Sequence, residues 1–321
     1  MKICLVTPAP TYSRKGNRVT ALRWARILRE LGHRVVIVEE YYGERCDVLV
    51  ALHARRSHPS IARFHHKHPE LPLILALTGT DLYGDIHTDA SAQESLEMAD
   101  RFILLQPAGI EELSDHLRHK AWVIYQSITA PPGRFVPKKG IFELCVLGHL
   151  RPVKDPFRTA MASRQLPPSS RIQVVHVGGA LTDAMRVLAN TEAAANPRYR
   201  WLGELPRWRV LRVLARSRAL VLTSQMEGGA NAVSEAIACS VPVISSRISG
   251  SIGLLGEDYP GYFPTEDTEA LTDLLIRIET DTAFYDTLKT WCEELKPIVD
   301  PDRERQSWKR LLQDLVNSKN K

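Results

Sequence analysis

Short apolar runs alternate with helix-forming segments along the whole chain, and this alternation is the feature that most limits its possible folds. In the first half, runs of strand length occupy residues 3–7, 34–38, 47–51, 73–77, 101–105 and 121–125. Between the first two runs, apolar residues from Ala21 to Leu31 recur at three- and four-residue spacing and end before Gly32, as in an amphipathic helix. Strands that alternate with helices form parallel sheets covered by helices on both faces. The pattern therefore predicts a doubly wound α/β domain.

The alternation stops once and then restarts. Residues 130–140 are rich in Pro, Gly and Lys, which is typical of a linker. Further strand-like runs follow at residues 143–147, 172–177, 219–223 and 241–245. We therefore expect two similar α/β domains, residues 1–136 and 141–298, followed by an amphipathic helix within residues 299–321. Open α/β sheets bind ligands beyond the carboxyl ends of their strands, so the loops that follow the strands are where candidate site residues are sought.

Composition excludes several classes of protein. The net charge of +5, from 42 basic and 37 acidic residues, is weak evidence for a nucleic-acid partner and suits a small anionic substrate. The five cysteines are scattered without a Cys-x-x-Cys pair, so we expect neither a zinc site nor a disulfide framework, and a reducing, cytoplasmic location. No stretch approaches 18 continuous apolar residues and no signal peptide is recognised, so no membrane span is expected. His65, His66 and His68 have a spacing unlike a zinc pair and indicate a solvated helix end.

One segment of the second half combines groups that bind phosphate with groups that bind sugar hydroxyls. Glu227 and Glu235 lie eight residues apart, with Gly228-Gly229 directly after the first of them and a helix-forming run around the second. Free N–H groups and the positive end of a helix favour anions. Carboxylates on either side suit sugar hydroxyls better than phosphate. The segment therefore points to a nucleotide-sugar, with phosphate in the middle and polyols at both ends.

Two basic loops of the first half follow predicted strands. The first, residues 8–18, contains Arg14, Lys15 and Arg18 with a glycine and an asparagine just before a helix. Such a loop can hold an anion against the helix N-terminus, and the alternative is a solvated surface loop. Arg55 and Arg56 follow the third strand, where contact with an acceptor and an ordinary basic surface are equally good interpretations.

Two further loops carry candidate polar groups. After the fourth strand, the turn from Thr78 to Asp81 can place Asp81 to orient a sugar hydroxyl or act as a base, and the alternative is a helix cap. After the first strand of the second half, Arg151 and Lys154 are two cations that can neutralise a leaving diphosphate, work often done by a metal. The alternative for this loop is an ordinary basic surface.

Taken together, these motifs resemble the nucleotide-sugar glycosyltransferases of family four, over nearly the whole chain and most specifically over residues 227–244. The resemblance implies the GT-B fold: two doubly wound Rossmann-like domains facing a central cleft, with the C-terminal helix crossing back to the first domain. It also implies that Glu227 lies by the donor hexose, that Glu235 holds the ribose hydroxyls and that Lys154 contacts the diphosphate. The loop at residues 201–205 resembles the one whose backbone reads the base.

The resemblance and the loop chemistry together give the expected site. The catalytic residues are Arg151, Lys154 and Glu227. The donor-binding residues are Gly16, Gly203, Leu205, Gly228, Gly229, Ala230, Asn231 and Glu235. The acceptor-binding residues are Lys15, Asn17, Arg18, Arg55, Thr78 and Asp81. No metal or other cofactor is expected, since the UDP-sugar is a substrate.

Two departures from the family pattern affect the site. His149 stands where the family has an arginine, for which Arg151 can substitute, and Thr78 stands where the family often has a histidine near the donor sugar. Several loops are similar to those of the selenosugar synthases of selenoneine biosynthesis, notably residues 15–18, 52–56, 77–83 and 148–156. That narrower resemblance implies transfer of a hexosyl or N-acetylhexosaminyl group from UDP-glucose or UDP-N-acetylglucosamine to selenophosphate, forming a 1-seleno-sugar. Transfer to a hydroxyl acceptor, a UDP-sugar epimerase and a nucleotide-sugar sensor remain open as alternatives.

Overall fold

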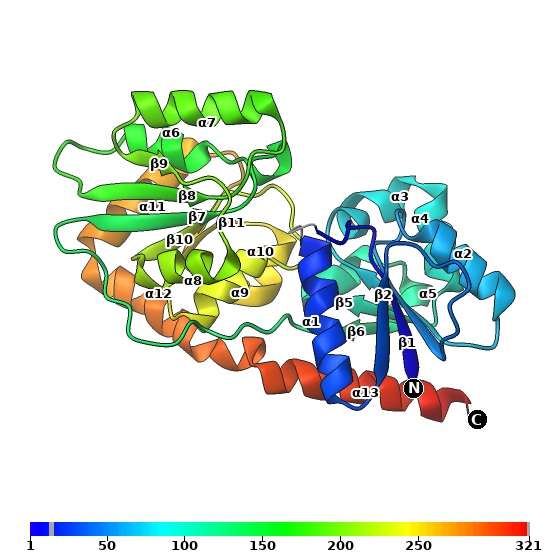
Figure 1. Ribbon diagram of the computed structural model, residues 1–321. Helices are drawn as coiled ribbons and strands as arrows, with labels where there is room; N and C mark the ends of the chain where they lie inside the picture. The colour runs from blue at the N-terminus through cyan, green and yellow to red at the C-terminus, as the bar shows by residue number, and fades with distance from the viewer. Residues whose placement is uncertain (13–15, 320–321) are drawn as a thin grey trace. The chain divides into compact units, whose positions relative to one another are not determined.

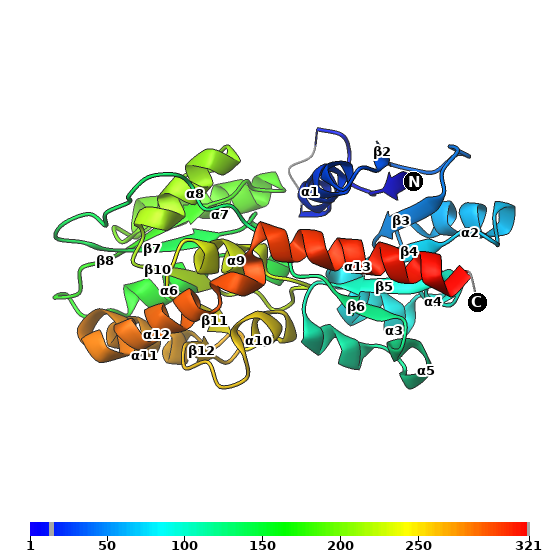
Figure 2. The same ribbon diagram turned by 90° about the horizontal axis from the view of Figure 1, so that it is seen from below.

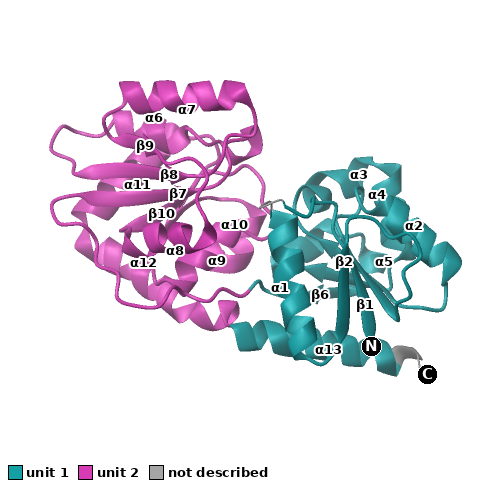
Figure 3. Cartoon of the chain, in the orientation of Figure 1, with its two compact units in different colours: residues 1–126, 301–321 teal, residues 127–300 magenta. Residues whose placement is uncertain are grey.

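The structure is a computed structural model that describes residues 1–12 and 16–319 (Figure 1). The chain forms two compact units, which are described separately (Figure 3). Unit 1 comprises Met1–Gln126 and Pro301–Lys321, and unit 2 comprises Ser127–Asp300. Each unit contains one six-stranded sheet in which all paired strands are parallel. The prediction of two Rossmann-like α/β domains is therefore confirmed.

The sheet of unit 1 has the strand order β2-β1-β3-β4-β5-β6. Its strands are β1 (Lys2–Val6), β2 (Arg34–Val38), β3 (Val48–Leu52), β4 (Leu73–Leu77), β5 (Arg101–Leu104) and β6 (Ala121–Val123). Its helices are α1 (Gly16–Glu30), α2 (His58–Lys67), α3 (Ile86–Thr88), α4 (Ala90–Met98), α5 (Asp115–Arg118) and α13 (Pro301–Lys319), with a π-helix η1 (Asp81–Asp85) and a 3-10 helix η2 (Pro107–Glu112). The strands predicted from the sequence all form, with bounds that differ by one or two residues.

Two buried apolar clusters cover the two faces of this sheet. Ile3 and Leu5 of β1 belong to the cluster that contains α1 and α13, whereas Cys4 and Val6 belong to the cluster that contains α2 and α4. Side chains of a strand alternate between the faces of a sheet, so the two clusters lie on opposite faces. Both faces are therefore covered, as expected for a doubly wound parallel sheet.

The last helix, α13, closes one face of unit 1 (Figure 2). The rings of Trp24 on α1 and Trp308 on α13 meet edge to face, with centroids 5.1 Å apart. The indole Nε1 of Trp24 donates a hydrogen bond of 2.8 Å to Oε1 of Glu304, whose side chain is fully buried. A buried carboxylate is costly unless it is bonded, so this contact fixes where α13 sits on α1.

The sheet of unit 2 has the order β12-β11-β10-β7-β8-β9. Its strands are β7 (Phe142–Leu147), β8 (Ile172–Val177), β9 (Tyr199–Trp201), β10 (Ala219–Leu222), β11 (Val243–Ser246) and β12 (Tyr262–Phe263). Its helices are α6 (Arg158–Arg164), α7 (Asp183–Ala195), α8 (Arg207–Arg216), α9 (Asn231–Ala238), α10 (Ser249–Leu255), α11 (Thr268–Thr280) and α12 (Thr282–Glu294), with 3-10 helices η3 (Pro152–Lys154) and η4 (Lys296–Val299). The edge strands β9 and β12 are absent from the sequence prediction because two or three residues give no readable periodicity.

The segment predicted as a linker, residues 130–140, lies within unit 2. The structure changes from unit 1 to unit 2 between Gln126 and Ser127, and back again between Asp300 and Pro301. The amide of Ile128 donates to the carbonyl of Val299 at 3.0 Å, which ties the two ends of unit 2 together. Residues 127–136 therefore belong structurally with the domain that follows them.

Candidate functional site

Two loops of unit 2, one after β7 and one after β10, are joined by hydrogen bonds at the carboxyl edge of the sheet. The hydroxyl of Thr223 donates to the carbonyl oxygens of Lys154 at 3.0 Å and Asp155 at 2.8 Å. The amide of Gln225 donates to the carbonyl of Val153 at 2.9 Å. Since β7 and β10 are neighbouring strands, these bonds make the two loops a single platform.

On this platform, the ammonium group of Lys154 forms an ion pair with Oε1 of Glu227. The hydroxyl of Ser224 donates to the same oxygen at 2.8 Å. The side chains of Lys154 and Glu227 keep 18% and 12% of their surface exposed, so a ligand can reach the pair. The structure thus brings two of the three expected catalytic residues into contact. The third, Arg151, is half-buried and precedes η3 in the same loop.

A glycine that the sequence analysis missed allows the Glu227 loop to take this position. A Cβ atom on Gly250 of α10 would lie 2.1 Å from the carbonyl oxygen of Glu227 and 2.9 Å from its Cβ. Such distances are sterically forbidden, so only glycine fits where α10 passes the loop. Nothing in the local sequence around Gly250 distinguishes it from a glycine in any other helix.

The start of α9 leaves room for an anion. No side chain of the described residues caps this helix at Ala230, whereas Thr182, Asp267 and Asp281 cap α7, α11 and α12. The Oδ1 atom of Asn231 is buried and has no hydrogen-bond partner among the described residues. An uncapped N-terminus with an unpaired buried oxygen beside it is suited to a ligand that carries both an anion and a hydrogen-bond donor. The expected donor residues Gly228 to Asn231 all lie here.

The second glutamate of the motif has a partner that the sequence analysis also missed. Glu235 of α9 is buried, and its Oε1 lies 2.7 Å from Nη1 of Arg207 in the first turn of α8. A cation in the first turn is disfavoured by the helix macrodipole, so Arg207 does not serve the stability of α8 itself. The observation indicates that Arg207 is placed there to hold Glu235.

Two histidines fix the backbone around Gly148. Nδ1 of His149 accepts a hydrogen bond from the amide of Gly179 at 3.1 Å, and burial lowers the pKa of His149, so this imidazole is neutral with its hydrogen on Nε2. His176 is fully buried, and burial lowers its pKa to about 4. Its two ring nitrogens lie 3.0 Å from the carbonyl oxygen of Gly148 and 2.9 Å from the hydroxyl of Tyr199. As a neutral ring it donates to the first and accepts from the second.

The loop after β9, expected to read the base, lies beside these residues. Gly203 adopts φ +67° and its carbonyl oxygen accepts from the amide of Gly178 at 2.9 Å. The indole of Trp201 donates to the carbonyl oxygen of Gly178 at 2.8 Å. Leu205 is half-buried at the end of this loop. The loops after β7, β8 and β9 are therefore in hydrogen-bonded contact, with the expected base-reading residues among them.

In unit 1, the expected residues of the first loop are only partly described. Lys15, and Arg14 beside it, lie outside the described residues. Gly16 is the exposed first residue of α1, and Asn17 is half-buried. Arg18 lies on the buried face of α1, and its Nε atom is buried with no hydrogen-bond partner in the described part of the chain. A buried guanidinium nitrogen without a partner is suited to an anionic ligand.

Asp81 has a structural position. Its side chain is fully buried, and its carboxylate accepts from the backbone amides of Ala54 at 3.0 Å, Thr78 at 3.1 Å and Gly79 at 2.9 Å. It thereby joins the loops after β3 and β4. This arrangement favours the capping interpretation over the expected contact with a substrate hydroxyl, because the oxygens are already bonded and hidden from solvent. Thr78 is half-buried beside it.

Arg55 of the same region is half-exposed, with 46% of its side-chain surface accessible. Its Nε atom lies 3.1 Å from Oδ2 of Asp85, the last residue of η1. His65 and His66 are exposed at the end of α2, as the solvated-end interpretation predicts. Within residues 1–12 and 16–319, no group of three His, Cys, Asp or Glu side chains is arranged to hold a metal ion. In the same residues, no helix is both long and apolar enough to cross a membrane.

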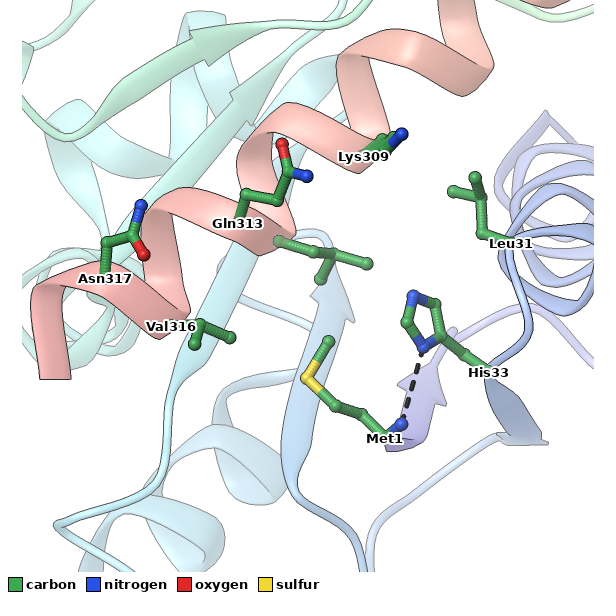
Figure 4. A pocket seen from close by; sticks show the side chains of 8 residues that line it. Met1, Leu31, His33, Lys309, Gln313, Val316 and Asn317 are labelled. Atoms are coloured by element: carbon green, nitrogen blue, oxygen red, sulfur yellow. Dashed lines mark hydrogen bonds between the residues drawn. The ribbon is translucent and has the colours of Figure 1, made fainter. Parts of the chain in front are cut away.

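Unit 1 also has a pocket of about 470 Å³ at the opposite edge of its sheet (Figure 4). It is lined by Met1, Leu31, His33, Lys309, Leu312, Gln313, Val316 and Asn317. These residues lie at the start of β1, between α1 and β2, and on α13, near the amino ends of the strands. None of the expected site residues that the structure describes lines this pocket.

Comparison with known proteins places these features in context. The family model described as "Glycosyl transferases group 1" matches residues 131–293. The structure is similar to that of Anabaena HepE in complex with UDP, with 15% identity, a TM-score of 0.77 and coverage of 98% of this chain and 100% of HepE. It is also similar to the sucrose-phosphate synthase of Thermosynechococcus elongatus, with 16% identity, a TM-score of 0.76 and 99% coverage of both chains.

A third similar structure is a UDP-forming α,α-trehalose-phosphate synthase from Burkholderia xenovorans. Its identity is 11% and its TM-score 0.69, with coverage of 95% of this chain and 80% of the synthase. At such identities the similarity establishes the fold, which is of the GT-B type, and leaves substrates to be argued from the residues.

Proposed function

This chain belongs to the group 1 glycosyltransferases, and from that premise we propose that it transfers a hexosyl or N-acetylhexosaminyl group from a UDP-sugar to selenophosphate. UDP-glucose and UDP-N-acetylglucosamine are the proposed donors. Binding of UDP by HepE, and formation of UDP by the Burkholderia synthase, support a uridine nucleotide as the leaving group. The finer proposal, the selenophosphate acceptor, is supported by the chemistry of unit 1.

In the proposed reaction, the platform of unit 2 stabilises the departing UDP. Lys154 and Arg151 supply positive charge, and the uncapped start of α9 supplies backbone N–H groups. Preorganised charge at a leaving group lowers the barrier because it needs no rearrangement as the negative charge develops. Glu227 orients the hexose, and Glu235, held by Arg207, binds the ribose hydroxyls. The two cations do the work for which other enzymes use a metal.

The bond changes are simple. The selenium of selenophosphate attacks the anomeric carbon, a C–Se bond forms, and the bond from that carbon to the β-phosphate oxygen breaks. UDP leaves with the electron pair of that bond. Hydrolysis of the Se–P bond then consumes one water molecule and releases phosphate, which leaves a 1-seleno-sugar.

The observation that carries the acceptor proposal is the position of Asp81. This carboxylate, the one candidate base that the sequence offered, is fully buried and accepts three backbone N–H bonds. A hydroxyl acceptor gains from a base that removes its proton. Selenophosphate is already an anion with a soft nucleophilic selenium, so it needs cations for docking rather than a base. Half-exposed Arg55 and its exposed neighbour Arg56 meet that requirement.

A donor-by-acceptor activity matrix tests the proposal. Wild-type protein is incubated with UDP-glucose or UDP-N-acetylglucosamine, and with selenophosphate, thiophosphate, a plain alcohol or no acceptor. Release of UDP and the sugar product are measured by chromatography and mass spectrometry. We expect turnover with selenophosphate and a C–Se product. UDP release with the alcohols alone would reject the selenium acceptor, and epimerised UDP-sugar without any acceptor would reject transfer.

A further inference from the structure

His53 has an unusual backbone conformation at the carboxyl end of β3. Its φ is +77°, a region that residues other than glycine rarely adopt and that costs on the order of 1 kcal/mol. Its side chain is 4% exposed, and its Nε2 atom is buried without a hydrogen-bond partner among the described residues. Strain and an unpaired buried nitrogen in one residue are both unfavourable, so a fold retains them together only where they serve a purpose.

The unpaired nitrogen of His53 faces an equally unsatisfied oxygen. Oδ2 of Asp85 lies 3.8 Å from Nε2 of His53, too far for a hydrogen bond, and it is buried with no hydrogen-bond partner in residues 1–12 and 16–319. Its nearest cation is the guanidinium of Arg55, with Nε at 3.1 Å. Asp85 ends η1, a π-helix, and π-helical turns are frequent at functional sites.

The tautomer of His53 follows from its other nitrogen. Nδ1 lies 3.4 Å from the backbone amide of Arg56 and accepts from it, so the neutral ring carries its hydrogen on Nε2. Burial lowers the pKa of His53 and keeps the ring neutral near pH 7. The Nε2–H group of His53 therefore faces Oδ2 of Asp85 but lies too far away to form a hydrogen bond. A pair that served stability alone would be expected to close to hydrogen-bond distance.

We propose that Arg55, Asp85 and His53 form a site that binds the oxyanion group of the acceptor by exchange of partners. This inference rests on the proposed function and adds the residues that dock the acceptor. In the unoccupied site, Asp85 holds Arg55. When an oxyanion arrives, the guanidinium turns to it, and the Nε2 hydrogen of His53 replaces Arg55 on Asp85.

The geometry supports each part of this exchange. Arg55 is 46% exposed and Nε is the atom that lies 3.1 Å from Asp85, so the outer edge of the guanidinium can turn to an oxyanion. Arginine binds oxyanions bidentately through such an edge. Asp85 is only 18% exposed, so water cannot readily replace a lost partner on its Oδ2. His53 is the buried donor close enough to do so after a shift of less than about 1 Å.

The exchange explains why an otherwise costly histidine is present. Without His53, release of Arg55 would leave a buried carboxylate oxygen bare, at a cost of about 1–3 kcal/mol. That cost would weaken oxyanion binding by roughly ten- to a hundredfold. A hydrogen bond from His53 removes most of it. The strained φ of His53 is then the conformation that points its ring at Asp85 rather than at solvent.

Three variants with inorganic phosphate as the probe test the site, because their expected effects differ in sign. Arg55→Lys loses the bidentate edge and weakens phosphate binding by about tenfold or more. His53→Asn tolerates the positive φ and keeps an acceptor for the Arg56 amide, but lacks the Nε2 hydrogen, so phosphate binding also weakens. Asp85→Asn removes the anion that competes for Arg55 and tightens phosphate binding. Calorimetry measures the three dissociation constants against wild type.

The control is Arg26→Lys, a surface arginine of the same unit that pairs with Glu30 and leaves phosphate binding unchanged. In steady-state kinetics, phosphate competes with the acceptor and not with the UDP-sugar, and His53→Asn raises the acceptor KM with little change in kcat. Weaker phosphate binding in Asp85→Asn, or unchanged binding in Arg55→Lys, overturns the inference. UDP binding is measured in wild type and in every variant. If wild type does not bind UDP, the proposed donor is rejected. That outcome is distinct from the phosphate-binding results, which test the oxyanion site.

Discussion

The loops at the carboxyl edges of the two sheets differ in how completely their polar groups are paired. In unit 2, Thr223 ties the loop of Lys154 to the loop of Glu227, and Lys154 and Glu227 neutralise each other. In unit 1, the carboxylate of Asp81 accepts three backbone hydrogen bonds, but Nε2 of His53 and Oδ2 of Asp85 lie 3.8 Å apart with no hydrogen bond between them. The contrast is between the Lys154–Glu227 pair, which is formed before a ligand arrives, and the His53–Asp85 contact, which our proposal closes only when a ligand arrives.

The largest expected effect tests whether the paired site of unit 2 performs the chemistry. Lys154→Ala removes the charge proposed to stabilise UDP, and we expect turnover to fall about a hundredfold or more. The melting temperature changes little, since Ser224 still donates to Glu227 and this carboxylate keeps 12% of its surface exposed to water. UDP release under saturating donor and thermal unfolding measure the two effects.

A matched control for that change is Lys138→Ala. Lys138 also pairs with a buried glutamate, Glu143, at 2.6 Å, but near the amino end of β7 rather than its carboxyl end. Turnover is expected to stay near wild type in this variant. Equal loss in both variants would mean that ion pairs of unit 2 matter for folding only, and the assignment of Lys154 to the leaving group would be wrong.

A second prediction concerns pH and the neutral ring that holds the Gly148 loop. Burial lowers the pKa of His176 from 6.5 to about 4, so the unfolded chain binds the proton more readily than the folded one. This residue's contribution to stability is fully present above about pH 6.5 and is lost as pH falls toward 4, by roughly 2–3 kcal/mol. Urea unfolding at a series of pH values measures the slope.

His176→Gln is the comparison for that series. The amide has no proton to gain in this range, so the acid-side slope should be shallower than in wild type. An identical slope in both proteins would show that other groups cause the acid sensitivity, and that the bonds of His176 to Gly148 and Tyr199 do not depend on its charge state.

A third prediction concerns Glu304, a buried carboxylate of unit 1 that lies on the face covered by α13. Glu304→Ala leaves the indole N–H of Trp24 buried without its acceptor and should cost about 2 kcal/mol of unfolding free energy. Denaturant unfolding measures it. Asp302→Ala, which breaks an exposed pair with Arg305, is expected to cost less than about 0.5 kcal/mol. Equal midpoints for the two variants would contradict the role given to Glu304.

The smallest expected effect concerns the partner of Glu235. Arg207→Gln removes the cation that orients this carboxylate, and we expect the dissociation constant for UDP to rise about tenfold. Turnover at saturating donor should change little. Arg212→Gln is the control, because Arg212 lies on the same helix over the ring of Trp208 and pairs with no carboxylate in the described part of the chain. If both variants bind UDP like wild type, Glu235 does not depend on Arg207.

The sequence predicted well what depends on local pattern. The strands of both sheets, apart from β9 and β12, follow from periodicity. Motifs directly after strands predict Lys154 and Glu227 as site residues, and the structure brings these two side chains into contact. The sequence singles out Asp81, but the same residue types cap turns and bind substrates. Only its burial and its three backbone donors distinguish the two roles.

What the sequence could not predict depends on contacts between distant segments. Gly250 is required because α10 packs against the carbonyl oxygen of Glu227, and the sequence near residue 250 does not predict that contact. The contact between His53 and Asp85 could not be predicted, because the two residues lie in loops that follow different strands. The sequence does contain a sign of the role of Arg207. A basic residue at the start of a helix is unfavourable with the helix macrodipole, which indicates that it pairs with a carboxylate elsewhere in the chain.

The position of α13 in unit 1 has a consequence for folding during synthesis of the chain. Unit 1 begins with the first strand but needs residues 301–319 to cover one face of its sheet, whereas unit 2 is a single continuous stretch of chain. A growing polypeptide therefore exposes the apolar surface around Trp24 until all of unit 2 has been made. The domain that starts first is completed last, so during translation it is the part of the molecule most in need of protection from aggregation.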